Sequence, residues 1–181
     1  MELAVRRLFE SPTIAQLAVE ISVLRSGDTL SLNRPLKRMD RELRDRLPMS
    51  FAQQRLWFLE QMERELTAYN MSYAWRLSGS LNTEALRRAL EAIVRRHEPL
   101  RTTFVMQDGE PVQVVGSSER FILPVEDLGS FEPGPQEAEI VLRFRLEAER
   151  PFDLTCDLML RASLLCLSED EHVLLLTMHH I

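Results

Sequence analysis

The chain has 181 residues, of which 45% are hydrophobic and 28% charged, so it has the composition of a globular protein and not of a disordered one. The formal net charge of −6 argues against a nucleic-acid-binding surface, which needs a basic patch. No apolar run approaches the roughly 20 residues that span a bilayer, and the N-terminus lacks the pattern of a signal peptide. Cys156 and Cys166 are the only cysteines, which excludes a disulfide framework and a cysteine-rich zinc site. We therefore expect a reduced, cytoplasmic protein.

Residues 1–25 carry apolar side chains near helical spacing and predict two short helices. Ser11-Pro12-Thr13 separates them, because Pro12 cannot continue a helix and Thr13 can cap the next one. Two helices of this length cannot bury a core alone, so we expect them to end a larger domain or to pack on the residues that come after them. Residues 26–48 lose the apolar pattern and predict an exposed linker, with a possible helical turn within 39–47.

From residue 49 onward the pattern is typical of a compact α/β unit. Ser50 stands where a cap is expected before a helix over 52–65, and a strand follows over 71–81. The candidate buried residues of this helix are Leu56, Phe58, Leu59 and Met62. Asn82 begins a second, amphipathic helix that ends before Pro99. Its predicted apolar face is formed by Leu86, Ala89, Leu90, Ile93 and Val94.

A hairpin is predicted around Asp108-Gly109, between strands over 100–107 and 112–115. A helix is then expected from Pro135 to about Glu149, because Pro135 suits a first turn and Pro151 stops the helix.

The last segment predicts two adjacent strands. Residues 158–166 alternate apolar side chains, so one face of this strand is buried. A polar turn over 168–171 returns the chain into residues 173–178, which are apolar on both faces. This second pattern is typical of a central strand covered by helices.

Two adjacent histidines, His179 and His180, end this central strand with their side chains on opposite faces, so a shared metal ion is not expected. One interpretation is a hydrogen-bonded core histidine beside an exposed one. The other is an imidazole held at a cleft, where a pKa near ~6.5 lets it accept a proton or a hydrogen bond from an attacking group. Cys166 lies in an apolar strand and is expected to be a core residue. Any catalysis would therefore be direct transfer, without a covalent enzyme intermediate.

Three segments in order resemble the core motifs of condensation domains of nonribosomal peptide synthetases. Residues 50–59 (SFAQQRLWFL) resemble the first motif, residues 96–104 (RHEPLRTTF) the second, and residues 178–181 (MHHI) the opening of HHxxxDG. Tyr69-Asn70 and Arg150-Pro151-Phe152-Asp153 also fit the family. This likeness covers 49–181, the N-terminal lobe of a two-lobed domain. Residues 1–25 separately resemble the C-terminal end of a peptidyl carrier domain, without its phosphopantetheine-bearing serine.

The resemblance implies an α/β fold: a chloramphenicol acetyltransferase-like lobe in which helices flank a mixed sheet, preceded by short N-terminal helices. The implied organisation is a carrier end over 1–25, a linker over 26–48 and the lobe over 49–181. Such domains form an amide bond when the amine of an acceptor aminoacyl thioester attacks a donor acyl or peptidyl thioester.

The resemblance also assigns roles to individual residues. It implies that His180 is catalytic and that His179, Arg55 and Arg101 support the site, with the two arginines as buried scaffolding rather than surface ion pairs. His97 is expected to be structural, and Trp57 and Trp75 to be core aromatics. The Asp and Gly of HHxxxDG would follow Ile181, so we expect little or no activity from this segment alone.

The implied partners are upstream and downstream carrier domains that present 4′-phosphopantetheine, the second lobe and an adenylation domain, with no nucleic acid or membrane. No cofactor or metal is expected to bind this chain itself. A non-catalytic docking domain and a coenzyme A-dependent acyltransferase of the same fold are the alternatives. The carrier-like residues 1–25 argue against the acyltransferase.

Overall fold

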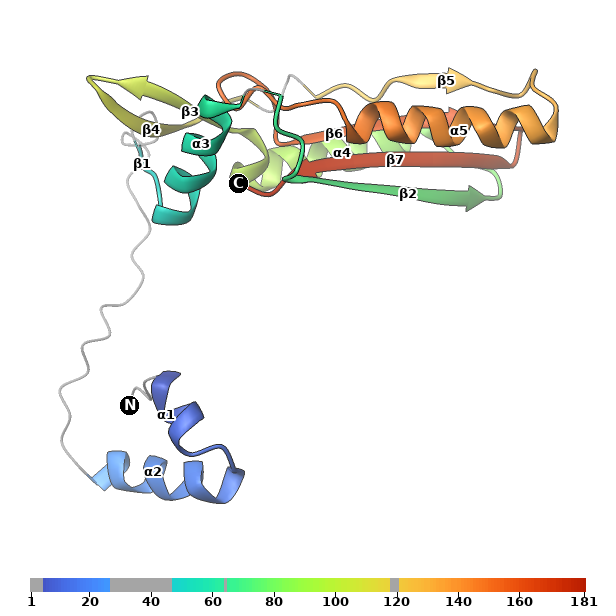
Figure 1. Ribbon diagram of the computed structural model, residues 1–181. Coiled ribbons are helices and arrows are strands. Elements are labelled where there is room, and N and C mark those ends of the chain that lie inside the picture. Colours follow the sequence, from blue (N-terminus) through green and yellow to red (C-terminus); the bar gives the residue numbers. More distant parts are fainter. Residues whose placement is uncertain (1–4, 27–46, 64, 118–120) are drawn as a thin grey trace. The chain divides into compact units, whose positions relative to one another are not determined.

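The computed structural model describes residues 5–26, 47–63, 65–117 and 121–181, in two units. The first unit contains α1 (Val5–Glu10) and α2 (Ile14–Ser26) (Figure 1). Thr13 caps α2 as predicted: its hydroxyl accepts from the Gln16 N–H at 3.3 Å, and its own N–H donates to the Gln16 side chain at 3.2 Å. Four apolar side chains of this unit are at least 65% exposed, namely Phe9, Ile14, Val19 and Val23. The linker prediction for 26–48 falls mostly outside the described residues.

The second unit contains two sheets. The smaller sheet is antiparallel and has the order β1-β4-β3, formed by β1 (Leu47–Pro48), β3 (Thr102–Gln107) and β4 (Glu110–Val115). The larger sheet has the order β2-β7-β6-β5, formed by β2 (Asn70–Ser78), β5 (Val125–Asp127), β6 (Leu160–Cys166) and β7 (Glu171–His179). β5 runs parallel to β6 and the other neighbours are antiparallel, so this sheet is mixed as expected.

The described residues of this unit form the helices α3 (Phe51–Met62), α4 (Thr83–Arg96), the 3-10 helix η2 (Glu98–Arg101) and α5 (Pro133–Ala148). Both predicted caps are confirmed, since Ser50 accepts from the Gln53 N–H and Asn82 from the Ala85 N–H. α5 begins at Pro133, earlier than the predicted Pro135. Both prolines fit a first helical turn, where a backbone N–H has no partner to lose, so the sequence does not say which of them comes first.

The predicted hairpin between β3 and β4 is confirmed. Asp108 and Gly109 have φ values of 53° and 84°, as in a two-residue hairpin turn whose twist matches that of its strands. Glycine adopts this region without strain, which explains why the turn falls here.

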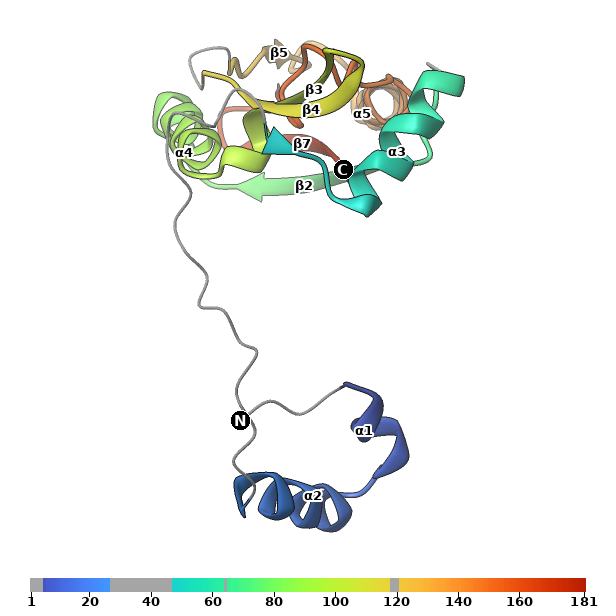
Figure 2. The same ribbon diagram turned by 90° about the vertical axis from the view of Figure 1, so that its left-hand side faces the viewer.

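β7 is the central strand that the sequence predicts. Leu174 on one face joins the cluster that contains Leu90 and Val94 of α4, whereas Val173 and Leu175 on the other face join Ile140 of α5. The two helices therefore cover opposite faces of the sheet, as the two views show (Figure 1 and Figure 2). Because both faces are buried, the register of β7 is fixed, and so is the point at which its terminal histidines leave the sheet.

Some predicted core residues are in fact exposed. Phe58 and Met62 of α3 are 58% and 71% exposed, and Ala89 and Ile93 of α4 also face solvent. Helical periodicity identified these elements, but each helix buries a narrower stripe than its apolar residues cover. The side of α3 that packs against the rest of the unit carries Trp57 and Glu60 instead.

Trp75 is not a core aromatic. It is 45% exposed and stacks on Tyr73, with ring centroids 5.4 Å apart and an interplanar angle of 11°. β2 is the outer strand of its sheet, so an aromatic residue on it is covered less completely than one on β7.

The core predicts a specific stability difference between two leucines. Leu164 of β6 is fully buried, so Leu164→Ala should lower the free energy of unfolding by about 2–5 kcal/mol, by lost burial and a residual cavity. Leu146 of α5 is 54% exposed, and Leu146→Ala should change it by less than about 0.5 kcal/mol. Urea unfolding of both variants measures the difference, and equal losses would contradict the described core.

Candidate functional site

The sequence motifs converge on one hydrophobic cluster, which we call the motif cluster. Trp57 from residues 50–59, Phe104 from residues 96–104 and Ile181 after the histidine pair all pack in it. Its other members are Met49, Phe152, Leu154 and Met159. Segments far apart in the chain therefore meet at the end of β7 where the histidines lie.

Three hydrogen bonds fix the backbone at the histidine pair. The His179 N–H donates to the Met159 carbonyl at 3.2 Å, and the His180 N–H donates to the Tyr69 carbonyl at 3.1 Å. The Ile181 N–H donates to Nδ1 of His179 at 3.2 Å. Tyr69 precedes β2 and Met159 precedes β6, so the backbone is held from the strands on both sides of β7.

The two histidine side chains have different surroundings, as their alternation along the strand predicted. His180 lies just beyond β7 and is exposed, whereas His179 is partly buried. The His179 ring lies between Tyr69, at a centroid distance of 6.3 Å, and Phe152, at 5.6 Å. His180 therefore presents an accessible imidazole on a backbone that has little freedom to move.

The surroundings of His179 favour its neutral form. Its pKa is lowered to about 4, chiefly by burial and to a smaller extent by the nearby His180 and Arg161. Because Nδ1 accepts the Ile181 N–H, the ring proton of the neutral imidazole lies on Nε2. The ring thus acts as a fixed acceptor for the segment that carries His180.

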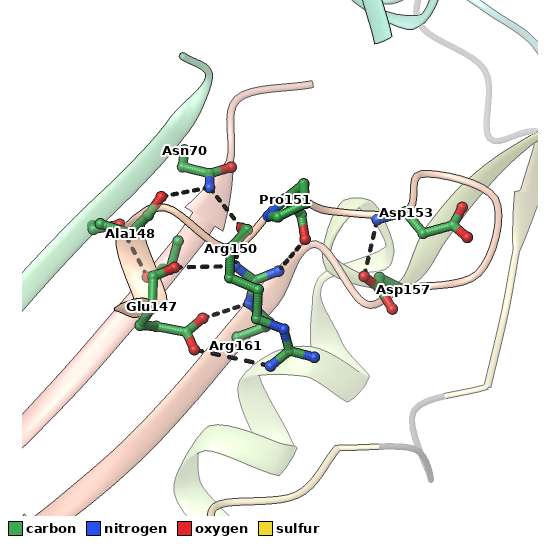
Figure 3. A network of polar contacts seen from close by, with 10 residues as sticks. Asn70, Glu147, Ala148, Arg150, Pro151, Asp153, Asp157 and Arg161 are labelled. Atoms are coloured by element: carbon green, nitrogen blue, oxygen red, sulfur yellow. Dashed lines mark hydrogen bonds and ion pairs between the residues drawn. The ribbon is translucent and has the colours of Figure 1, made fainter. Parts of the chain in front are cut away.

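Arg161 lies at the centre of a polar network beside this pair (Figure 3). Its guanidinium donates to the Glu147 carboxylate and to the main-chain oxygens of Glu147, Arg150 and Pro151, and its carbon lies 3.7 Å from the centroid of the Phe152 ring. The Asn70 amide donates to the carbonyls of Ala148 and Arg150 at 2.8 and 2.9 Å. We call this network, with Asn70, Glu147, Arg150, Pro151, Phe152 and Arg161, the Arg161 clamp.

The sequence predictions did not single out Arg161. The available signal was an arginine in a strand whose other residues are almost all apolar. A charge that is buried in such a strand requires partners. The resemblance did include Asn70 and residues 150–153, and the structure brings these together around Arg161 (Figure 3).

The two predicted scaffolding arginines differ. Arg101 is 14% exposed at its side chain, donates to the Gly116 carbonyl at 2.6 Å and lies 3.6 Å from the Glu98 carboxylate, so it is mostly covered, while its role at the site stays a prediction. Arg55 is exposed on α3, and its predicted burial is wrong because this helix packs through the side that carries Trp57 and Glu60. His97 is the C-cap of α4, with its N–H bonded to the Ile93 carbonyl.

A cavity of about 190 Å³ adjoins the motif cluster. Thr102 and Phe104 of the second motif and Ile181 beyond the histidines contribute to its wall. The η2 segment reaches the histidine strand through Met159, whose N–H donates to the Leu100 carbonyl at 2.9 Å while its own carbonyl accepts the His179 N–H.

Other chemistry is not apparent in the part of the chain that the structure describes. These residues contain no group of three or more His, Cys, Asp or Glu side chains placed to hold a metal ion. Burial raises the pKa of the Cys166 thiol, and partial desolvation together with the carboxylates of Asp153 and Asp157 raises the pKa of the exposed Cys156 thiol, which disfavours the nucleophilic thiolate in both. No described helix is both long and apolar enough to cross a membrane.

The neutral state of His179 predicts a pH effect on stability. Its folded pKa of about 4 is below the ordinary 6.5, so between these values the unfolded chain binds a proton that the folded chain does not. The free energy of unfolding should therefore fall as the pH drops from 6.5 to 4. The fall from pH 7 to pH 4.5, measured by urea unfolding, should be smaller in His179→Gln by on the order of 1 kcal/mol, allowing for partial solvent screening. Identical pH profiles for the two proteins would show that His179 is not held neutral.

Comparison with known proteins identifies the family. The model of the Condensation domain family matches residues 43–181. A linear gramicidin synthase protein of Brevibacillus parabrevis is 40% identical over 181 residues, which is 100% of this chain and 2% of that protein. Chondramide synthase of Chondromyces crocatus is 48% identical over 137 residues, 76% of this chain and 4% of that protein. The chain thus spans only a few per cent of these relatives.

Solved structures show the same fold. The starter condensation domain of rhizomide synthetase matches with a TM-score of 0.66 and 23% identity, over 74% of this chain and 32% of that one. The first condensation domain of the calcium-dependent antibiotic synthetase, solved with a substrate analogue, matches with a TM-score of 0.64 and 23% identity, over 75% of this chain and 33% of that one. The expected chloramphenicol acetyltransferase-like α/β fold is confirmed, and the chain belongs to the condensation-domain family.

Proposed function

We propose that the protein containing this chain forms an amide bond between two carrier-bound substrates, with His180 at the reacting centre. The observation that carries the proposal is the exposed His180 imidazole, on a backbone that hydrogen bonds hold from both neighbouring strands. Membership of the condensation-domain family supports it, as do the peptide synthases among the relatives. On this view the chain is the N-terminal lobe of a larger domain, in keeping with the roughly one third of each solved domain that it covers.

The reaction needs few protein groups. A thioester is already activated, and an α-amine with a pKa near ~8 is partly neutral at cytoplasmic pH. The amine nitrogen forms a bond to the carbonyl carbon, the carbon–sulfur bond breaks, and the thiolate leaves with the donor carrier and gains a proton. Holding the two reactants in this geometry supplies much of the rate enhancement.

His180 acts on the attacking amine. An imidazole nitrogen that accepts a hydrogen bond from the amine directs the lone pair of the amine nitrogen at the thioester carbonyl. The same imidazole nitrogen can take the proton that amide formation releases. His179 and Arg101 support this residue, the first through its ring acceptor and the second by bracing the η2 segment. A fixed backbone matters because small misplacements of a reacting group cost large factors in rate.

The surrounding organisation follows from the same proposal. Residues 1–25 end a carrier domain and residues 26–48 link it to the lobe. The exposed apolar side chains of α1 and α2 support this, and so does the gramicidin synthase match, which extends across the whole chain beyond the family segment at 43–181. The partners are carriers that present 4′-phosphopantetheine, a second lobe and an adenylation domain. The protein works in the cytoplasm, where its cysteines stay reduced.

Replacing His180 tests this function directly. In the synthetase that contains this chain, His180→Ala should lower the single-turnover rate of amide formation by about 10²-fold or more, because the group that accepts the amine proton is lost. Pyrophosphate exchange first identifies the amino acids that the neighbouring adenylation domains activate. The carriers are then charged with these amino acids in radiolabelled form.

Arg88→Ala is the control, because Arg88 is an exposed residue of α4 outside the three motifs, and it should leave the rate unchanged. An unaltered rate in His180→Ala would remove the catalytic assignment. Carrier binding without any amide formation in the parent protein would favour a docking domain instead. Transfer from coenzyme A without a carrier would favour an acyltransferase.

A further inference from the structure

We propose that Arg161 is a positioning residue for His180, which acts through Phe152 and His179 to hold the backbone that carries the reacting imidazole. This inference rests on the proposed function of His180. Arg161 itself touches neither the reacting atoms nor the His180 ring in this scheme, so its role differs from that of a catalytic residue.

The first step is the anchoring of Arg161. Its side chain is only 12% exposed, and all three of its nitrogens donate hydrogen bonds. Three of the acceptors are main-chain oxygens at the end of α5 and in the segment that follows, so the side chain holds a piece of backbone as well as a single carboxylate. An exposed ion pair has no such consequence, because its partners remain free to move in solvent.

The second step passes from Arg161 to Phe152. The guanidinium carbon lies 3.7 Å from the centroid of the Phe152 ring, and Phe152 as a whole residue is 3% exposed. The planar guanidinium therefore packs on the ring while its edges hold the Arg150 and Pro151 carbonyls just before it. Both the main chain and the side chain at this point are fixed by one residue.

The third step joins Phe152 to the histidine pair. The Phe152 and His179 ring centroids lie 5.6 Å apart with an interplanar angle of 59°, and Tyr69 contacts His179 by the edge of its ring. Held in this orientation, His179 accepts the Ile181 N–H and so fixes the peptide that follows His180. A displaced Phe152 would free the His179 ring to rotate and would release this acceptor.

The positive charge of Arg161 also helps to keep His179 neutral, and therefore able to accept the Ile181 N–H. A protonated His179 would place an N–H at Nδ1, facing the Ile181 N–H donor, and the hydrogen bond would be lost. The nearby guanidinium is one of the causes that lower the pKa of His179, after burial and the neighbouring His180. The clamp therefore maintains both the orientation and the neutral form of the acceptor.

A second strand supports the same segment. The Asn70 amide donates to the carbonyl of Arg150, which also accepts from Arg161, and the Asn70 backbone pairs with His179 in the sheet. Asn70 lies on β2 and Arg161 on β6, so the segment before Phe152 is anchored from both sides of β7 (Figure 3).

The test is a double-mutant cycle between Arg161 and His180 in the synthetase that contains this chain. The single-turnover rate of amide formation is measured at varied acceptor-carrier concentration, with carriers charged as above. Arg161→Met should lower the maximal rate about 10- to 100-fold and leave the half-saturating carrier concentration within about threefold, because it misplaces a reacting group and not the carrier. In the His180→Ala protein, adding Arg161→Met should lower the maximal rate by less than about a further twofold, because the group that Arg161 positions is already absent.

Arg143→Met is the matched control. Arg143 also binds carboxylates, those of Glu126 and Glu139, but from a part of α5 outside the clamp. It should leave the maximal rate within about twofold. If Arg161→Met does not fold, as judged by thermal unfolding, the same cycle is carried out with Phe152→Leu, which keeps an apolar side chain and removes the ring.

The outcomes separate the two proposals. The positioning role would be overturned if the Arg161 or Phe152 variant lowered the maximal rate by the same factor in the parent protein and in the His180→Ala protein. It would also be overturned if the variant changed only the half-saturating carrier concentration. If turnover of the His180→Ala protein is too slow to quantify, the comparison of maximal rate with half-saturation decides alone. A full rate in His180→Ala itself would instead remove the proposed function on which the inference rests.

Discussion

The hydrogen bonds that hold residues 179–181 are the constraint on which the site depends. β7 ends between β2 and β6, and the backbone of the histidine pair bonds to Tyr69 before one strand and to Met159 before the other. A residue at the free end of an outer strand would have such support on one side only. Because β7 is a central strand, hydrogen bonds on both of its sides hold the backbone that carries His180.

The two histidines differ in their exposure to solvent. His180 is exposed, as the proposed function requires, whereas the partly buried His179 packs against Tyr69 and Phe152, has a lowered pKa and accepts the Ile181 N–H. A neutral acceptor suits this place, since a charged ring could not accept the Ile181 N–H. Burial, which would be a cost to a catalytic base, is here what keeps the supporting residue in its required form.

The arginines show why location matters more than charge. Arg87 pairs with Glu84 and Glu91 along the surface of α4, where solvent screens the attraction and the helix gains little. Arg161 makes a similar ion pair with Glu147, but its side chain is only 12% exposed and it also contacts three main-chain oxygens and an aromatic ring. Removing it would release several backbone and side-chain contacts at once, whereas removing Arg87 loses only carboxylate pairs at the surface.

The sequence by itself determined the local structure and the family. The caps at Ser50 and Asn82, the Asp108-Gly109 turn and the doubly apolar strand before His179 depend on backbone geometry within a few residues, so they could be predicted without knowing the fold. The prediction that His179 and His180 point to opposite faces rests on strand alternation in the same way.

Only the tertiary structure decided which side of each element is buried and which distant residues meet. Phe58, Met62 and Trp75 have apolar side chains that a core could use, but each lies on an element that is covered incompletely, and Arg55 faces solvent for the same reason. The contact of Arg161 with Phe152 and of Phe152 with His179 joins β6, the segment after α5 and the end of β7. Such contacts depend on how strands pair and helices pack over long separations, which hydrophobic periodicity in a single segment does not encode.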